Sequence, residues 1–447
     1  MNIASGAFAS LNVRPMSVLE RARALCQFID SAPSPFHAVA ECSRRLVEAG
    51  FTRLEESDDW TEAAPKAFVE RSGALIAWDS SRAKAADSGF RILGAHTDSP
   101  NLRIKPHANT GAAGFRQLGV EVYGGVLLNS WLDRDLGLSG RVMLRGENGP
   151  QALLLRVDRP LLRVAQLAIH LDREVNDRGL VLDKQLHMAP IWALGRPAPD
   201  VFEEFLAAEL GCELRDILAW DLMCHDVMPA RLLGLTEDFV VASRLDNLCS
   251  CFCGLEAFLA AGASSDGNCV RMLSFFDHEE VGSTSHRGAA SPLLKDVLER
   301  IVLARGGARE AMHRAIARSW FISADMAHGT HPNYREKHEP EHWITLNAGP
   351  VIKINTNMRY ATDAEGEAMF ARCCEVAQIP YQKYSHRSNL SCGSTIGPIT
   401  AANLGMRVVD VGNPELSMHS CREMCGSADP EFMVRGLEAF FTSASSD

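Results

Sequence analysis

Histidine and carboxylate side chains follow several apolar, strand-like runs in this sequence, at the point where each run ends. They are His96 and Asp98 after Phe90–Ala95, Asp246 after Phe239–Ala242, Glu279 and Glu280 after Val270–Phe276, Asp325 after Trp320–Ser323, and His419 in the loop beyond Arg407–Val411. In open α/β sheets, functional sites collect beyond the carboxyl ends of the strands. Residues far apart in the sequence are therefore expected to converge at one edge of a sheet.

These residue types favour a metal site. Two imidazoles and three carboxylates can hold a pair of zinc-like divalent ions, with one carboxylate bridging both, and a further acid is left for proton transfer. A lone histidine or acid after a strand is usually an ordinary loop residue, but several together, all after strands, indicate a shared centre. Zinc is the expected metal, and cobalt and manganese tolerate the same ligands.

Two local patterns refine this hypothesis. Asp98 lies two residues beyond His96, within reach of the ring nitrogen that does not bind metal, and such a contact orients a ligand histidine. Glu279 and Glu280 are adjacent, so one can bind metal while the other acts as a base whose pKa depends on nearby charge and burial. The alternatives are a turn cap for Asp98 and an exposed acidic loop for the two glutamates.

Other catalytic motifs receive little support. His338–His342 matches the H-E-x-x-H pattern, but Pro340 opposes the continuous helix that this metal-binding motif needs. The sequence contains neither a G-x-x-x-x-G-K-[ST] phosphate-binding loop nor a G-x-S-x-G nucleophile motif. Nucleotide hydrolysis and serine hydrolysis are therefore disfavoured.

The 13 cysteines are sparse and irregularly spaced, which predicts reduced thiols in a cytoplasmic protein. Three of them alternate within residues 249–253 and are expected to be buried thiols on a helix, because no second Cys/His pair follows at zinc-finger spacing. Cys421 and Cys425 lie close to His419. Spacing alone leaves a soft-ligand site at these two cysteines open.

The order of apolar runs and helical stretches predicts an α/β fold. From residue 239 onward the two alternate, which favours a mostly parallel sheet with helices on both faces. Residues 107–238 instead carry β-type segments punctuated by glycines. We therefore expect a catalytic domain formed by residues 1–106 and 239–447 and split by an inserted β-rich domain, residues 107–238, that serves as a dimerisation or lid domain.

The first 50 residues predict two helices. An apolar face recurs from residue 17, and the proline-containing stretch Ser31–His37 is expected to interrupt the helix. A second helix is expected from about residue 38 to Gly50, since glycine suits the end of a helix.

Composition limits the classes of partner. The 447 residues are 46% hydrophobic and 23% charged, as in an ordinary globular protein. Lys and Arg total 45 against 56 Asp and Glu, and the net charge of −11 disfavours nucleic acid and anionic membranes as partners. No apolar run approaches the roughly 18 residues that cross a bilayer, and the first residues do not match a secretory signal.

Longer blocks around the candidate residues resemble one known family. The blocks are GAHTDSP at Gly94–Pro100, RLDN at Arg244–Asn247, DHEEVGS at Asp277–Ser283, SADMAHG at Ser323–Gly329 and MHS at Met418–Ser420. In this order, and over nearly the whole chain, they resemble the aspartyl aminopeptidase family of binuclear zinc metallo-aminopeptidases. The resemblance implies an enzyme that hydrolyses the N-terminal residue from peptides through a water shared by two metal ions.

The resemblance also implies the ligand set. Asp246 would be the carboxylate that bridges the two metals. His96 and Asp325 would complete one metal site, and Glu280 and His419 would complete the other.

Further residues receive roles by the same resemblance. Glu279 would be the general base, and Asp98 would be the companion of His96. His170 and His328 would contact substrate, and His170, which other interpretations make a metal ligand, would reach across from a neighbouring subunit. The family assembles from dimers, so the resemblance implies a homododecamer.

One departure from the family bears on substrate choice. Members that prefer acidic residues often carry a lysine at the position of Asn357, in the stretch Lys353–Tyr360. Lys353 or Arg359 could supply the missing charge for an N-terminal Asp or Glu. Alternatively, the pocket takes neutral residues.

Two rival functions are distinguishable. A metal-dependent amidohydrolase or deacylase of the same architecture would not need a free substrate amine, so blocking the N-terminus separates it from an aminopeptidase. A shell-forming scaffold with a degenerate site would lack peptidase activity. The complete ligand set and Glu279 argue against the scaffold.

Overall fold

The central layer of the structure, a computed structural model that describes residues 16–262 and 268–443, is a nine-stranded sheet. Its strands, in spatial order, are β1 (Thr52–Arg53), β2 (Lys66–Arg71), β3 (Ala74–Asp79), β13 (Val270–Phe276), β4 (Phe90–His96), β14 (Trp320–Ala324), β18 (Arg407–Gly412), β16 (Val351–Ile354) and β17 (Gln382–Ser385). The four strands from β13 to β18 are parallel, whereas β3 and β16 flank them antiparallel. The predicted α/β fold is confirmed, and the parallel pairing runs without interruption through the central strands of the sheet.

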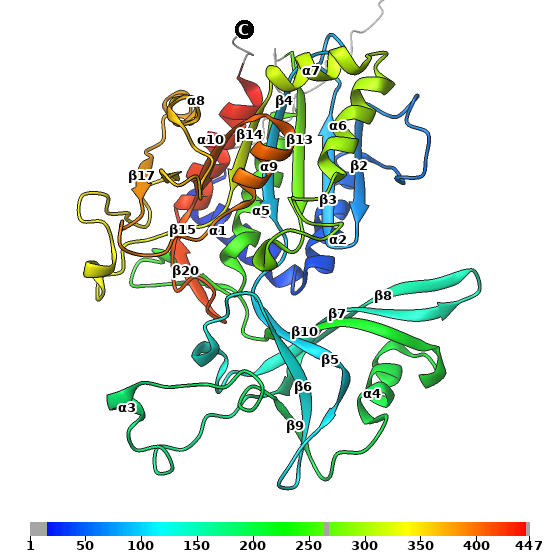
Figure 1. Cartoon of the computed structure of the whole chain (residues 1–447), viewed down its shortest axis with the longest axis vertical. Coiled ribbons are helices and arrows are strands. Elements are labelled where there is room, and N and C mark those ends of the chain that lie inside the picture. The colour runs from blue at the N-terminus through cyan, green and yellow to red at the C-terminus, as the bar shows by residue number, and fades with distance from the viewer. Residues whose placement is uncertain (1–15, 263–267, 444–447) are drawn as a thin grey trace, which may run out of the picture.

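Helices cover both faces of this sheet (Figure 1). One face packs against α1 (Val18–Ser31), α2 (Pro35–Glu48), α5 (Leu245–Ala261), α8 (Ala364–Ala377) and α10 (Asp429–Thr442). The other packs against α6 (Leu293–Ala304), α7 (Arg309–Ala317) and α9 (Ile396–Leu404). On β4, Leu93 and Ala95 enter the first apolar cluster and Phe90 and Ile92 the second, as the alternation of side chains along a strand requires.

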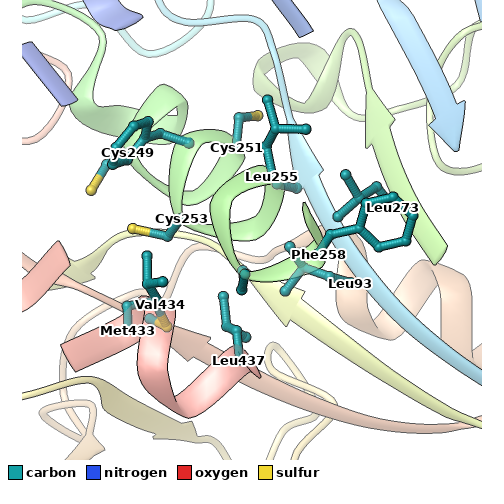
Figure 2. Close-up of a cluster of buried hydrophobic side chains, with 14 of the residues drawn as sticks. Leu93, Cys249, Cys251, Cys253, Leu255, Phe258, Leu273, Met433, Val434 and Leu437 are labelled. Carbon is teal, nitrogen blue, oxygen red and sulfur yellow. The ribbon is translucent and has the colours of Figure 1, made fainter. Parts of the chain in front are cut away.

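Helix α5 lies at the centre of the first apolar cluster. Figure 2 shows Leu255 and Phe258 of α5 facing Leu93 and Leu273 of the sheet, while α10 lies along another side of the helix. The helix comes close to the sheet at Gly254, where an added Cβ would lie 1.9 Å from Leu93 Cδ2. The three cysteines within residues 249–253 are free and buried on this helix, as predicted.

A second, antiparallel sheet lies below the α/β layers in Figure 1. Its strands, in spatial order, are β8 (Gly149–Leu162), β7 (Leu136–Gly146), β10 (Ile217–Asp226), β5 (Asn101–Thr110), β6 (Phe115–Tyr123) and β9 (Ile191–Leu194). This sheet has its own apolar core, which includes Phe202 and Leu206 of α4 (Val201–Leu210). The short helices on this side are η1 (Leu128–Trp131), α3 (Val175–Arg178) and η2 (Leu214–Asp216).

A small five-stranded sheet is the third sheet of the structure. It contains β11 (Arg231–Leu233), β12 (Phe239–Ala242), β20 (Glu423–Gly426), β19 (Pro414–Leu416) and β15 (Ala327–His328). The expectation that residues 239–242 belong to the large parallel sheet is wrong, because β12 pairs antiparallel with β11 and β20 instead. The remaining short helices are η3 (Glu279–Val281) and η4 (Arg335–Lys337).

The second predicted helix begins earlier than expected. Ser34 is the N-cap of α2, its side chain accepts a hydrogen bond from His37 N, and Pro35 is the first helical residue. Proline is tolerated there because its missing N–H would have no partner inside the helix. Pro35 thus starts a helix and does not lie in the interruption that its residue type predicted.

Across both described stretches, no helix has the length and apolar character needed to cross a membrane.

Candidate metal centre and active site

The predicted ligands all lie at ends of strands or helices on one side of the nine-stranded sheet. His96 is the last residue of β4, Asp325 follows β14, and Asp246 lies in the first turn of α5. Glu280 lies in η3, just beyond β13, and His419 lies in the loop between β19 and β20. The parallel strands therefore bring these residues together, as expected for a site beyond the carboxyl ends of the strands in an open α/β sheet.

The five side chains converge around Asp246. His96 Nε2 lies 3.3 Å from Asp246 Oδ1 and 3.8 Å from Asp325 Oδ2. On the other side, His419 Nε2 lies 3.5 Å from Asp246 Oδ2 and 3.4 Å from Glu280 Oε2. Ligand atoms of His96, Asp246 and Glu280 all lie within 4.8 Å of one another. Each oxygen of the Asp246 carboxylate thus faces a different imidazole.

Backbone carbonyls orient both imidazole rings. His96 Nδ1 lies 3.0 Å from the carbonyl oxygen of Asp98, and His419 Nδ1 lies 3.0 Å from that of Gly125. A carbonyl oxygen can only accept, so each Nδ1 carries the proton and each Nε2 faces the carboxylates. The approach to His419 is close: a Cβ on Gly125 would lie 3.1 Å from His419 Nδ1.

Asp98 holds the turn that carries both glutamates. Its Oδ1 accepts from Glu279 N at 3.1 Å, and its Oδ2 accepts from Glu280 N at 3.2 Å and from the Tyr123 hydroxyl at 2.6 Å. Asp98 Oδ1 also lies 3.4 Å from His96 Nδ1. Burial raises the pKa of Asp98, but His96 and these hydrogen bonds outweigh burial, and the net pKa is lowered. Asp98 therefore remains a carboxylate that positions two neighbours at once.

Negative charge dominates the cluster. Burial raises the pKa of Glu279 to about 8 and that of Glu280 well above its usual range, and nearby carboxylates add to both shifts. Burial opposes protonation of His419, but Asp246 and Glu280 outweigh it and raise its pKa to about 10. These carboxyl groups repel one another in a buried space, so a bound cation would stabilise their charged forms.

The donor set fits a divalent metal ion. Asp246 Oδ1 is buried and accepts no hydrogen bond, although a buried carboxylate oxygen normally has a partner. Two imidazole nitrogens and several carboxylate oxygens are ligands that zinc accepts. His96, Asp246, Glu280, Asp325 and His419 are therefore the residues that would hold metal.

Sequence reasoning missed Glu423, a buried acid beneath the cluster. Its Oε1 accepts from His419 N at 2.7 Å, and its Oε2 accepts from Asp246 N at 3.1 Å. Burial raises the pKa of Glu423 to about 8. This side chain ties the backbones of two candidate ligands together. The only hint in the sequence is an acid four residues beyond His419.

Sequence reasoning also gave Lys353 a different role. Its Nζ donates to Met326 O at 3.1 Å and lies 3.4 Å from Asp325 Oδ1. The side chain is buried. Its ammonium group therefore supports Asp325, in place of the substrate contact that was one of its predicted roles.

Three of the four other predicted substrate residues are exposed, and the fourth, His328, lies close enough to the cluster for Asp246 and His419 to act on its pKa. His328 packs with its ring 6.1 Å from that of Tyr384, and burial lowers its pKa to about 4. Asn357 and Arg359 are exposed on the turn after β16, and His170 is exposed between β8 and α3. Within the two described stretches, no hydrogen bond or ion pair connects these four side chains to the five candidate ligands.

The alternative metal motifs find no support among residues 16–262 and 268–443, where the one group of clustered potential ligands contains His96, Asp246 and Glu280. His338 Nε2 instead accepts from His331 N at 3.0 Å, in a stretch of loop. Cys421 is buried in the core of the six-stranded sheet.

Comparisons with known proteins identify the family of this chain. The family profile described as Aminopeptidase I zinc metalloprotease (M18) matches residues 28–441. A probable M18 family aminopeptidase 2 from Streptomyces coelicolor is 49% identical over 93% of this chain and 96% of the relative, and one from Mycobacterium leprae is 47% identical over 94% and 98%.

Solved structures agree as well. The structure of an Ape4 and Nbr1 complex matches with a TM-score of 0.91 and 38% identity, over 94% of this chain and 85% of that one. The S. cerevesiae mApe1 dodecamer matches with a TM-score of 0.82 and 26% identity, over 95% of this chain and 96% of that one. The extent of the profile match and the identity to these relatives decide the family. This chain belongs to the M18 family of aminopeptidase I zinc metalloproteases and is a metal-dependent aminopeptidase.

Proposed function

We propose that this aminopeptidase uses two divalent metal ions, zinc by preference, bridged by Asp246. The position of Asp246 between His96 and His419 carries this proposal, because each of its oxygens faces one imidazole at 3.3 or 3.5 Å. Asp325 completes the first ligand group and Glu280 the second. When bound, the two ions supply Lewis-acid chemistry that lowers the pKa of water and polarises the scissile carbonyl.

Glu279 is the general base in this proposal. The hydrogen bond from Glu279 N to Asp98 fixes its backbone next to the ligands, and burial favours its protonated form. A carboxyl group with a raised pKa can take a proton from the attacking water and later give it to the leaving amine. The acidic cluster would also hold the substrate's free α-amine, which restricts cleavage to the first residue.

Aminoacyl reporters test this mechanism. Free reporters should be hydrolysed, N-acetylated ones should not, and a chelator should abolish the activity. Glu279→Gln should retain metal by elemental analysis and lose about 10²–10⁴-fold in kcat. Glu341→Gln, which changes an exposed loop glutamate, is the matched control and should retain activity. Full activity of Glu279→Gln would contradict the assigned base, and equal cleavage of N-acetylated reporters would indicate a deacylase.

We further propose that Arg359 confers a preference for N-terminal Asp or Glu. In the stretch Lys353–Tyr360, Asn357 is neutral and Lys353 is engaged by Asp325. Arg359 is exposed and forms no ion pair within the described residues. It is therefore the remaining free cation of this stretch.

This preference predicts a selective loss in Arg359→Ala. Because only the acidic side chain would contact the guanidinium, kcat/KM should fall about tenfold or more for Asp and Glu reporters. The values for Leu and Ala reporters should remain unchanged. A uniform fall across all four reporters would contradict the assignment, and wild-type preference for Leu or Ala would favour a neutral pocket.

We also propose that the chain forms a homododecamer in which residues 107–238 act as a dimerisation and lid domain. Large apolar side chains are exposed on this part, namely Leu167, Ile169, Leu171, Val181, Leu186 and Leu194. Such a concentration of exposed apolar side chains is typical of an interaction surface. The mApe1 dodecamer supports the same proposal by its similarity to this chain.

A cytoplasmic location is consistent with the cysteines. All thirteen lie in the described residues and all are free, as expected for a protein kept in a reducing compartment.

A further inference from the structure

A cavity of about 710 Å³ opens on the side of the nine-stranded sheet opposite the ligand cluster. It lies where β4, β14 and β18 begin, between α8 and the last turn of α10. Its charged lining consists of Arg91, Arg372 and Arg407, with Glu365 as the one acidic residue. The cavity is therefore electropositive although the whole chain is acidic.

Two of these arginines belong to one row of residues that crosses the sheet in register. Asp79 pairs with Arg271, Arg271 with Arg91, Arg91 with Trp320, and Trp320 with Arg407. Residues in register on neighbouring strands point to the same face of a sheet. Asp79 is the one acid of the row, and it lies 2.6 Å from Arg271. Asp79 thus neutralises the guanidinium of Arg271. The guanidinium of Arg91, the next residue in the row, is not neutralised in this way.

Arg91 is the buried arginine of this row that has no acidic partner among the described residues. Its side chain is buried, with 4% of its surface exposed, and its one hydrogen bond is a 3.4 Å contact from Nη1 to Arg318 O. No acidic side chain in residues 16–262 or 268–443 forms an ion pair with Arg91. Burial lowers the pKa of Arg91, and the nearby charge of Arg407 acts in the same direction. A buried charge without a counter-ion is costly, so an anion beside Arg91 would stabilise the protein.

The other two cavity arginines are exposed and also lack acidic partners among the described residues. Arg407 lies over the Trp320 ring, 4.4 Å from its centroid, and donates to Ala317 O. Arg372 forms no ion pair in the same part of the chain. Three guanidinium groups can therefore approach one ligand from different sides of the cavity.

The remaining wall is largely apolar. On α8, the cavity-lining residues recur at helical spacing, so that Ala368, Met369, Cys373 and Val376 form one face with Arg372. Opposite them, Trp320 contributes an aromatic surface. A bare inorganic ion would leave this wall exposed to water.

We propose that this cavity binds a small oxyanion attached to an apolar group, with the carboxylate or phosphate held by Arg91, Arg372 and Arg407 and the apolar group against α8 and Trp320. Guanidinium groups bind both kinds of oxyanion through paired hydrogen bonds. The volume admits a molecule of drug-like size.

Calorimetric titration of the full-length enzyme at fixed ionic strength tests the proposal with three probes. We expect 3-phenylpropionate, phenyl phosphate or both to bind, and inorganic phosphate to bind at least tenfold more weakly than the tighter of the two. The two aromatic probes distinguish a carboxylate ligand from a phosphate ligand. Arg372→Gln and Arg407→Gln, which change exposed side chains, should each weaken binding about tenfold without altering hydrolysis. Arg91→Met should abolish binding and is informative if it folds.

Arg314→Gln is the matched control, because it removes an exposed arginine that pairs with Asp87 outside the cavity, and its probe affinity should remain that of the wild type. The proposal fails if neither aromatic probe binds, if inorganic phosphate binds as tightly as they do, or if Arg372→Gln and Arg407→Gln leave binding unchanged. Deletion of residues 444–447 provides a further check. A tenfold gain in probe affinity on deletion would assign the cavity to the carboxyl end of the chain and overturn the proposal of a separate ligand.

Discussion

Asp98 connects three parts of the site at the level of single residues. It adjoins the ring of His96, receives the backbone N–H groups of Glu279 and Glu280, and is held by Tyr123. Hydrogen-bonded neighbours of metal ligands commonly affect affinity or activity about 10–100-fold. The hydroxyl of Tyr123 should therefore matter although it touches no candidate ligand.

Tyr123→Phe tests this role. Losing the 2.6 Å hydrogen bond loosens Asp98 and, with it, the turn that carries Glu279, so kcat should fall about tenfold while KM changes little. Reporter kinetics on metal-loaded enzyme measure both constants. Tyr334→Phe, which alters an exposed tyrosine away from the cluster, should behave as wild type. An unchanged kcat in Tyr123→Phe would show that Asp98 does not depend on this contact.

Residue types after strands were enough to predict that the five candidate ligands lie together. They were not enough to find Glu423, whose contacts with His419 N and Asp246 N depend on where β20 lies in the five-stranded sheet. The contact between Lys353 and Asp325 could not be predicted either, because Asp325 follows another strand. Which of the five ligands bind each metal remains a prediction.

At the scale of elements, the start of α2 places a histidine inside the protein. His37 is buried, and burial, together with the nearby Arg156, His225 and Arg244, lowers its pKa to about 4 against the opposing effect of Asp158. The unfolded chain would bind a proton near pH 6.5, well before the folded chain does. This histidine therefore stabilises the fold above pH 6.5, and the contribution is lost as the pH falls towards about 4.

Urea unfolding of wild type and His37→Gln measures this effect. Between about pH 7.5 and about pH 5, the wild type should lose about 2 kcal/mol more unfolding free energy than the variant, because only the wild type gains a proton at this position on unfolding. His313→Gln, an exposed histidine on α7, should follow the wild-type curve. Equal pH dependence in His37→Gln and wild type would refute the assignment.

Several strands were visible in the sequence because their apolar runs end abruptly, and the runs at 239–242 and 270–276 match β12 and β13 in full. Sheet membership was harder to predict. In sequence, β12 resembles the strands of the parallel sheet, yet it pairs with β11 and β20. Such pairing depends on partners that are distant in sequence. Pro35 likewise reads as a helix breaker until its place after the Ser34 cap is known.

At the scale of the whole molecule, the exposed His170 is predicted to serve the active site of a neighbouring subunit. It lies on the side of the six-stranded sheet and lacks contact, among the described residues, with the candidate ligands of its own chain. The neighbouring Leu171 and Val181 are 75% and 85% exposed. A subunit partner that covers these residues would also receive the histidine.

Mixing two inactive variants tests this arrangement. His170→Ala and Glu279→Gln should each be inactive alone, because each lacks one required group. Co-expressed as a random mixture, they should recover about a quarter of wild-type activity, since half the subunits keep Glu279 and half of their neighbours supply His170. His107→Ala, an exposed histidine of β5, should remain active alone. Failure of the mixture to recover activity would place His170 in the site of its own subunit, and full activity of His170→Ala alone would place it outside catalysis.

The path of the chain between the two sheets has a practical consequence. Only Thr97–Pro100 separates β4 from β5, and the six-stranded sheet then returns Tyr123 and Gly125 to Asp98 and His419. A truncated protein that keeps only the α/β layers would therefore not be catalytically active. It would lack Tyr123 and Gly125, whose hydrogen bonds position Asp98 and the His419 imidazole.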